Sequence, residues 1–175
     1  MLFRSFLRTA EAFAEKLAEL TDNRYEVEII NHNDYQAQMD KNKWYLETRQ
    51  DAKRIQNIIE MDRGNIEMSQ VYVNEIGRSY NPDFLALELP FLFKDHDHAT
   101  RVFEGEIGKK LLSDLADRSP ATGLAFTYSG GFRCIISKNE ISGIEDFKGA
   151  EFLTDIGPVQ IELVESIGAV PIPVA

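Results

Sequence analysis

The feature that most constrains the fold is the alternation between two apolar periodicities along the chain. Apolar residues recur at helical spacing in five stretches, residues 4–20, 48–62, 71–78, 102–115 and 158–166. Shorter apolar or alternating runs typical of strands cover residues 25–29, 65–70, 124–128, 132–137, 150–154 and 170–174. Helices that alternate with short strands predict an α/β fold with a largely parallel sheet.

Several short motifs predict where these elements begin and end. Asn81-Pro82-Asp83 is turn chemistry, and Asp97 is a candidate cap for the helix that follows it. Ser142 and Glu145 have the spacing of a capping box, which predicts one short helical turn. Pro158 suits the first turn of a helix, and Gly168 suits the position just beyond its end.

The charge balance argues against a nucleic-acid partner. Nineteen Lys and Arg residues stand against 29 Asp and Glu, a formal net charge of −10. Proteins that bind phosphate backbones present clustered basic residues, and the sequence shows no such cluster. A net acidic chain can still bind an anion, because local cationic groups set the potential of a binding site.

Neither terminus nor interior predicts a membrane segment. The first residues, Met1 to Arg8, lack a continuous apolar core and a small-residue cleavage site, so they do not form an intact secretory signal. No run of about 18 apolar residues occurs. If the sequence is complete as given, the chain is expected in the cytoplasm.

The sequence lacks the groupings that would predict catalysis or a cofactor. Cys134 cannot form an internal disulfide, and its apolar neighbours predict a buried strand thiol and not a nucleophile. The Asp95–His98 run could suggest metal ligands, but four adjacent residues do not converge on one ion, so a helix start rich in Asp is the simpler interpretation. With no phosphate-binding loop or nucleophile–base pair, we expect neither an enzyme nor a bound metal or cofactor.

Six ordered motifs then resemble a known family. They are Ala12–Lys16, Gly64–Met68, Leu87–Asp95 with His98-Ala99, Gly131-Phe132-Arg133, Ile144–Gly149 and Gly168–Pro173. Their order and spacing resemble the solute-binding proteins of tripartite ATP-independent periplasmic (TRAP) transporters, of the dicarboxylate-binding type.

The resemblance implies a type II periplasmic-binding-protein fold with two α/β lobes. Residues 1–128 correspond to a partial first lobe, and residues 129–175 to the start of the second. Relatives have a strand before the first helix and continue well beyond the last motif. The implied state is a truncated or split form, which alone binds its ligand weakly or not at all.

The resemblance also implies the binding residues. A guanidinium holds a carboxylate through paired N–H donors, and Arg133 matches one family arginine. The principal family arginine aligns with Leu153, which cannot pair with a carboxylate. Ser69, Gln70 and Tyr72 match a family loop that faces the ligand.

Two functions therefore remain open. The first is an extracytoplasmic, periplasmic subunit that captures a small organic acid, such as a C4-dicarboxylate or sugar acid, for delivery to membrane permease subunits. The second is a degenerate relative without carboxylate binding, which serves as a protein-interaction module or is a non-functional fragment. Leu153 in place of the arginine favours the second function, and the ordered motifs favour the first.

Overall fold

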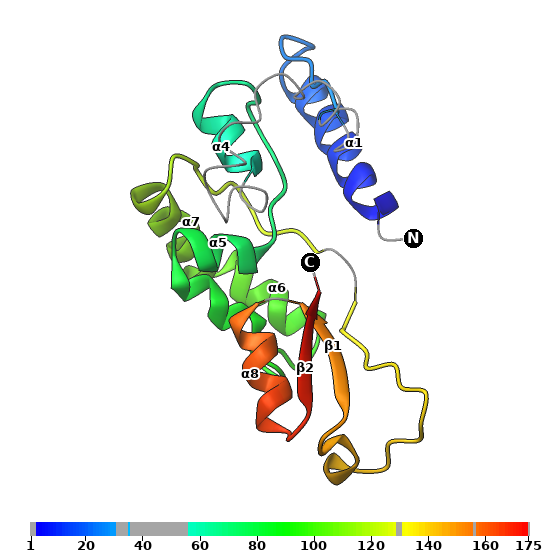
Figure 1. Cartoon of the computed structure of the whole chain (residues 1–175). Coiled ribbons are helices and arrows are strands. Elements are labelled where there is room, and N and C mark those ends of the chain that lie inside the picture. The colour runs from blue at the N-terminus through cyan, green and yellow to red at the C-terminus, as the bar shows by residue number, and fades with distance from the viewer. Residues whose placement is uncertain (1–2, 31–34, 36–55, 129–130, 156, 175) are drawn as a thin grey trace. The chain divides into compact units, whose positions relative to one another are not determined.

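The computed structural model describes residues 3–30, 35, 56–128, 131–155 and 157–174, which belong to two compact units (Figure 1). The first unit comprises Met1–Lys53 and Thr127–Arg133, and the second comprises Arg54–Phe126 and Cys134–Ala175. The lobe boundary expected between residues 128 and 129 stays a prediction.

The first unit contains helix α1, Phe3–Leu20, which confirms the helix predicted over residues 4–20. The helix ends in a hydrogen-bonded turn, where Thr21 donates from both its backbone N–H and its hydroxyl to the Leu17 carbonyl. Asp22 and Asn23 adopt positive φ angles of 51° and 56°, a conformation that short polar side chains tolerate. These residues redirect the chain after the last helical turn.

The strand predicted at residues 25–29 is wrong. The segment is irregular, and both Tyr25 and Ile29 are exposed. Alternating polarity favours a strand only where a neighbouring strand completes the hydrogen-bond ladder, and the described residues of this unit form no such ladder.

Short helices dominate the first half of the second unit. They are α4 (Gln56–Asp62), α5 (Val73–Ser79), the 3₁₀ helix η1 (Pro82–Glu88), α6 (His96–Glu104) and α7 (Glu106–Arg118). The predicted helix over residues 71–78 is confirmed as α5, and α4 confirms the later part of the helix predicted over residues 48–62. Its earlier part, residues 48–55, lies outside the described residues. The strand predicted over residues 65–70 is wrong, because this segment is an irregular connection.

Two helices replace the single helix predicted over residues 102–115. Gly105, in extended conformation, both ends α6 and begins α7. A Cβ at Gly105 would lie 2.6 Å from the Arg101 carbonyl oxygen in the last turn of α6, so this sharp exit from the helix favours glycine. The predicted cap at Asp97 is also wrong. Asp95 is the cap, and its carboxylate accepts a 2.7 Å hydrogen bond from the His98 N–H.

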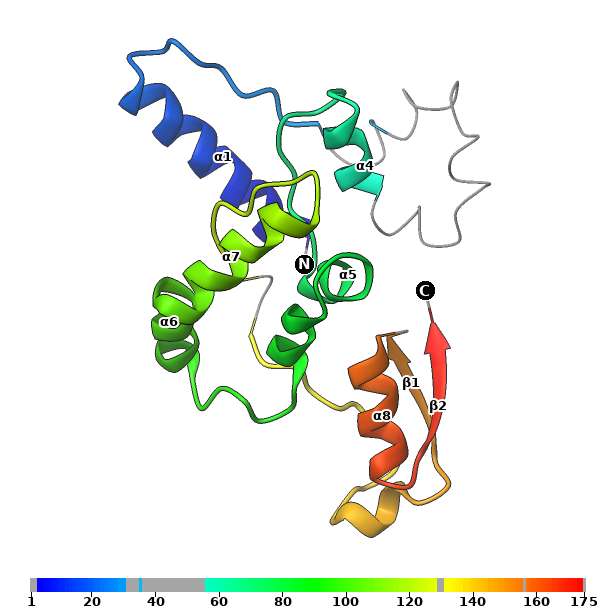
Figure 2. The ribbon, with the colours of Figure 1, turned by 90° about the vertical axis from the view of Figure 1, so that its left-hand side faces the viewer.

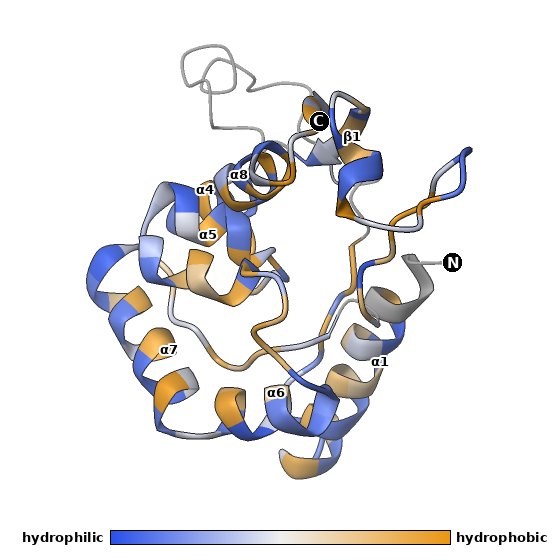
Figure 3. Cartoon of the chain, turned by 90° about the horizontal axis from the view of Figure 1, so that it is seen from below, coloured by the Kyte–Doolittle hydropathy of each residue, from blue (hydrophilic) through white to orange (hydrophobic). Residues whose placement is uncertain are grey.

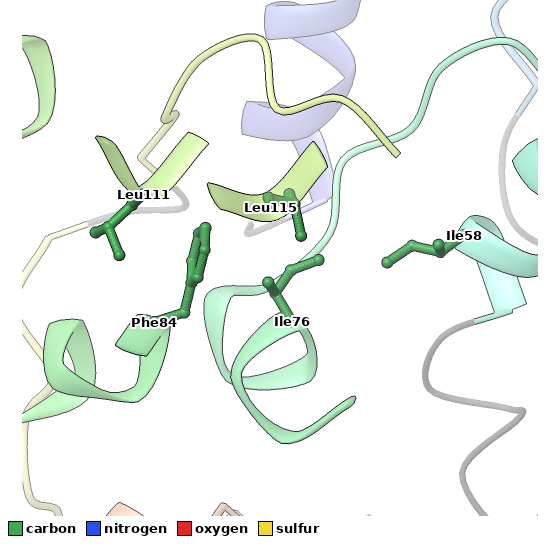
Figure 4. Packing of buried hydrophobic residues seen from close by; sticks show 5 residues of the cluster. All are labelled: Ile58, Ile76, Phe84, Leu111 and Leu115. Atoms are coloured by element: carbon green, nitrogen blue, oxygen red, sulfur yellow. The ribbon is translucent and has the colours of Figure 1, made fainter. Parts of the chain in front are cut away.

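A small apolar core holds these helices together. Ile58 from α4, Ile76 from α5, Phe84 from η1, and Leu111 and Leu115 from α7 are buried against one another (Figure 4). Helices α6 and α7 each carry hydrophobic and hydrophilic residues on different sides (Figure 3), as expected for helices that bury one stripe. Burial of apolar side chains at this cluster stabilises the helical part of the unit.

Asn81 joins the beginning of η1 to the end of α7. The side chain is fully buried, and its Oδ1 accepts hydrogen bonds from the Asp83 N–H at 3.1 Å and from Arg118 Nη1 at 3.2 Å. The turn predicted at Asn81-Pro82-Asp83 is therefore confirmed, and the same residue also anchors a helix 37 positions further along the chain.

The C-terminal part forms a parallel β–α–β arrangement. Strand β1 (Glu151–Asp155) pairs in parallel with β2 (Val170–Val174), and helix α8 (Pro158–Ser166) contacts both strands (Figure 2). All three elements were predicted from the sequence, α8 and β2 with the same bounds and β1 shifted by one residue. Gly149 and Gly168, with φ angles of 72° and 79°, form a 2.7 Å backbone hydrogen bond beside the strand starts. The predicted α/β character rests on this unit.

Strand β2 contains two prolines in alternate positions, Pro171 and Pro173. The Val170 N–H donates to the Ala150 carbonyl at 2.8 Å, on the side of β1. Residues 170, 172 and 174 therefore direct their backbone groups toward β1, and the two prolines face the other edge.

The strands predicted over residues 124–128 and 132–137 are wrong. Both segments are irregular, and all described residues from 131 to 146 are exposed. Ile136 is 95% exposed, and the Cys134 side chain, predicted to be buried, is exposed as well. Apolar content alone did not distinguish these segments from strands, because a strand also needs a neighbour in register.

The short turn predicted near Ser142 is confirmed as the 3₁₀ helix η2, Ile144–Phe147, but its cap differs by one residue. Asp146, and not Glu145, reaches back, and its carboxylate accepts hydrogen bonds from the N–H groups of Ser142 at 2.7 Å and Gly143 at 3.0 Å. These two backbone donors hold the pKa of Asp146 below its usual value.

Candidate functional site

The C-terminal end of β1 and the first turn of α8 are the natural place for a ligand in the second unit. In parallel α/β sheets, ligands bind beyond the carboxyl ends of the strands. Here β1 ends at Asp155, and α8 begins after Gly157, whose side-chain-free N-cap leaves the first N–H groups of the helix without a side-chain cap. Helix α8 also contacts η1, so α5 and η1 provide the facing groups.

Two buried carboxamides meet two carboxylates at this place, which we call the amide junction: Asn74, Glu88, Asp155 and Gln160. Asn74 Nδ2 donates to Asp155 Oδ2 at 3.4 Å, and Gln160 Nε2 donates to Glu88 Oε2. Asn74 is 8% exposed and Gln160 is 9% exposed, whereas the two carboxylates are half-buried. The junction connects the helical part of the unit to the β–α–β part.

The carboxylates determine how the amides are oriented. An ionised carboxylate only accepts hydrogen bonds, so each amide must present its NH₂ group to it and turn its carbonyl oxygen elsewhere. Those oxygens, Asn74 Oδ1 and Gln160 Oε1, are buried and accept no hydrogen bond within the part of the chain that the structure describes. A buried acceptor without a donor is unfavourable, typically by about 1–3 kcal/mol.

The predicted loop residues lie before helix α5. Ser69 Oγ donates to the Gln70 carbonyl at 3.3 Å, and Asn57 Nδ2 donates to the same carbonyl at 3.5 Å. Tyr72 is the N-cap residue of α5 and is half exposed. The three residues thus lie in one short connection, and the last of them, Tyr72, is two residues before Asn74 of the amide junction.

Arg133 belongs to the first unit, and its side chain is exposed. Its assignment as a carboxylate ligand, with Ser69, Gln70 and Tyr72, stays a prediction. Leu153, at the position of the missing family arginine, lies in β1 and is 70% exposed. Glu151 shares that face of the strand and is also exposed, so this face offers no cation at positions 151 and 153.

No pattern in the sequence predicted the amide junction. Asn74 and Gln160 occur inside predicted helices, where a polar residue usually faces solvent. Their burial depends on contacts between residues 72 to 81 positions apart, which periodicity does not reveal. The run Asp95–His98 forms the start of helix α6, as expected, although its cap is Asp95 and not Asp97. Among the residues that the structure describes, no group of three His, Cys, Asp or Glu side chains could hold a metal ion.

None of the helices in the part of the chain that the structure describes has the length and hydropathy of a membrane-spanning segment. The β–α–β arrangement, with polar side chains beyond the end of β1, places the protein in the α/β class.

The chain belongs to the bacterial extracellular solute-binding proteins, family 7, whose family model matches residues 5–175. The resemblance to TRAP solute-binding proteins is therefore confirmed. This is a family of transport proteins that bind solutes, and not a family of enzymes.

Similar proteins agree with this assignment. A protein of Haemophilus influenzae described as uncharacterized is 36% identical over 107 residues, which are 57% of this chain and 32% of that protein. The C4-dicarboxylate-binding periplasmic protein DctP of Rhodobacter capsulatus is 28% identical over 162 residues, 93% of this chain and 43% of that protein. The chain thus spans less than half the length of these relatives.

A solved structure confirms the predicted type II binding-protein fold. It is a TRAP periplasmic solute-binding protein from Xanthobacter autotrophicus with bound β-D-galacturonate. The TM-score is 0.71 at 20% identity, and the match covers 95% of this chain and 50% of the other.

Proposed function

We propose that the protein is an extracytoplasmic solute-binding subunit of a TRAP transporter that captures a small organic acid in the periplasm and delivers it to membrane permease subunits. The family match over residues 5–175 carries this proposal. The relatives support the class of solute, since one is named for C4-dicarboxylates and another contains a sugar acid.

In this proposal Arg133 pairs with the carboxylate of the solute, and Ser69, Gln70 and Tyr72 supply further polar contacts. A guanidinium suits this role because its parallel N–H donors match the two carboxylate oxygens. Arg133 is exposed, as a residue that receives a solute from water must be.

Calorimetric titration of the intact protein with succinate and with D-galacturonate tests the proposal. A truncated form alone would bind weakly or not at all, but the family match over residues 5–175 leads us to expect saturable one-to-one binding of at least one acid. Hydrogen bonds to charged groups contribute about 1.5–3 kcal/mol, so Arg133→Gln should weaken binding by about tenfold to a hundredfold. Arg8→Gln, another exposed arginine of the first unit, is the matched control and should bind like the original protein.

Equal binding by the Arg133 and Arg8 variants would remove Arg133 from the site but keep the function. Failure of the intact protein to bind any organic acid would contradict the function itself.

The second candidate is a relative that does not bind carboxylates and interacts with another protein instead. The exposed Leu153 at the family arginine position favours it. Leu153→Arg distinguishes the two candidates. If the original protein binds no acid and this variant does, the scaffold is competent and only the anchor has been lost.

A further inference from the structure

The amide junction contains an imbalance between donors and acceptors that points to a ligand. Its four side chains contribute two carboxylates and two carboxamides, and both NH₂ groups already face the carboxylates. Within the junction, two carbonyl oxygens are buried and accept no hydrogen bond in the described part of the chain, Asn74 Oδ1 and Gln160 Oε1. The same holds outside the junction for one donor atom, Asn81 Nδ2, beside the apolar core. The missing partner of the junction must therefore donate hydrogen bonds.

The position of Gln160 shows where such a donor would be received. Gln160 is the third residue of α8, and a Cβ added at Gly157 would collide with Gln160 Oε1. The oxygen therefore lies beside the N-cap residue of the helix, just beyond the carboxyl end of β1. Gln at this helix position commonly accepts from the N-cap backbone N–H, but here Oε1 accepts no such bond, because Nε2 is directed to Glu88.

Neither amide can turn over to correct the imbalance by itself. A rotated amide would place a carbonyl oxygen against a carboxylate oxygen, which exchanges a hydrogen bond for a repulsive contact. The two acceptors are thus held in place by Asp155 and Glu88.

We propose that Asn74 Oδ1 and Gln160 Oε1 form a hydroxyl-binding subsite, so that the solute is a hydroxylated acid of the sugar-acid kind and not a plain dicarboxylate. This inference rests on the proposed function and chooses between the two solute classes that it leaves open. Hydroxyl groups supply the donors that the subsite lacks, whereas an ionised dicarboxylate offers only acceptors and would face two carboxylates as well. A site with unpaired buried acceptors discriminates strongly against a ligand without the matching donors.

The test compares D-galacturonate with succinate in calorimetric titrations of the intact protein. The original protein should bind D-galacturonate more tightly. Asn74→Leu and Gln160→Met remove one acceptor each at nearly constant volume, and each should weaken D-galacturonate binding about tenfold, the usual effect of one lost hydrogen bond. Succinate binding, where detectable, should change less than about twofold.

Gly157→Ala gives an independent variant that keeps the amide. The added methyl group occupies the place of Gln160 Oε1 and displaces it, so the same selective loss is expected. Thr154→Val is the matched control. It changes a buried polar side chain of β1, next to Asp155, and leaves both acceptors in place. Thermal melting of each variant verifies that it folds.

The outcomes separate this inference from the proposed function. Tighter binding of succinate than of D-galacturonate would overturn the subsite and keep the function. Unchanged D-galacturonate affinity in folded Asn74 and Gln160 variants, or a parallel loss in the Thr154 control, would also overturn it. An intact protein that binds neither acid nor any other organic acid contradicts the function, and the subsite fails with it.

Discussion

The second unit is held together in two contrasting ways. In the helical part, five apolar side chains from α4, α5, η1 and α7 pack together, and each is nearly or fully buried. At the amide junction, four polar side chains meet and leave two buried oxygens unpaired among the described residues. The first arrangement is what stability requires, and the second resembles a site whose hydrogen bonds are completed by a ligand.

The largest effect should come from the apolar core. Phe84 is 2% exposed and its ring centroid lies 6.1 Å from that of Phe126. Phe84→Ala removes this packing and leaves a cavity, so we expect the free energy of unfolding to fall by about 3–4 kcal/mol in chemical denaturation. Phe91→Ala is the control, since Phe91 is 99% exposed, and it should change stability by less than about 0.5 kcal/mol. Similar losses in both variants would mean that the core does not carry the stability.

A medium effect is expected at the polar anchor beside this core. Asn81→Ala removes the acceptor that the Asp83 N–H and Arg118 share, so η1 loses its cap and α7 loses its connection to it. The free energy of unfolding should fall by about 1–2 kcal/mol. Asn139→Ala, at an exposed residue, is the comparison variant. If both variants melted at the same temperature, the buried asparagine would have no anchoring role.

Substitution at the amide junction should change the free energy of unfolding much less. Gln160→Met removes an unpaired buried oxygen along with one hydrogen bond to Glu88, and these effects offset each other. Stability should therefore change by less than about 1 kcal/mol in the same denaturation experiment. A loss as large as that of Phe84→Ala would show that the junction is a structural element, and the contrast between the two regions would disappear.

The smallest effect concerns a turn outside both regions. Asp146 has a lowered pKa in the folded chain, so its contribution is present at neutral pH and is lost as the pH falls through that lowered value. Hydrogen exchange of the Ser142 and Gly143 N–H groups should accelerate there, and the core amides should not change. Asp146→Asn should abolish this pH dependence. Exchange that is equally pH-dependent in the variant would assign the effect to another group.

The sequence predicted the elements whose stabilising contacts are local. Helix α8 and strand β2 were placed with the same bounds, because Pro158 and Gly168 mark the helix ends and the β–α–β closure is short. The strands predicted over residues 124–128 and 132–137 failed, since strand formation depends on a neighbour that composition does not specify. The helix break at Gly105 was not predicted, because it follows from a tight backbone turn against the end of α6 and not from the apolar stripe.

The candidate binding residues fall into two groups, those inferred from sequence motifs and those that only the structure brings together. Arg133, Ser69, Gln70 and Tyr72 were inferred from motifs, and the Arg133→Gln variant tests the first of them. In the amide junction, Asn74 and Asp155 are 81 positions apart, so their contact is visible only in the folded structure. The polarity of Asn74 or of Asp155 alone does not predict that the two side chains meet.

The alternate prolines of β2 limit how other polypeptides can pair with this strand. Because Pro171 and Pro173 lack N–H groups, the edge of β2 that faces away from β1 offers carbonyl acceptors at these positions but no backbone donors. A further strand could form only about half of the usual ladder there. Such an edge is a poor template for aggregation between copies of the chain, and it selects for neighbours that bring their own donors.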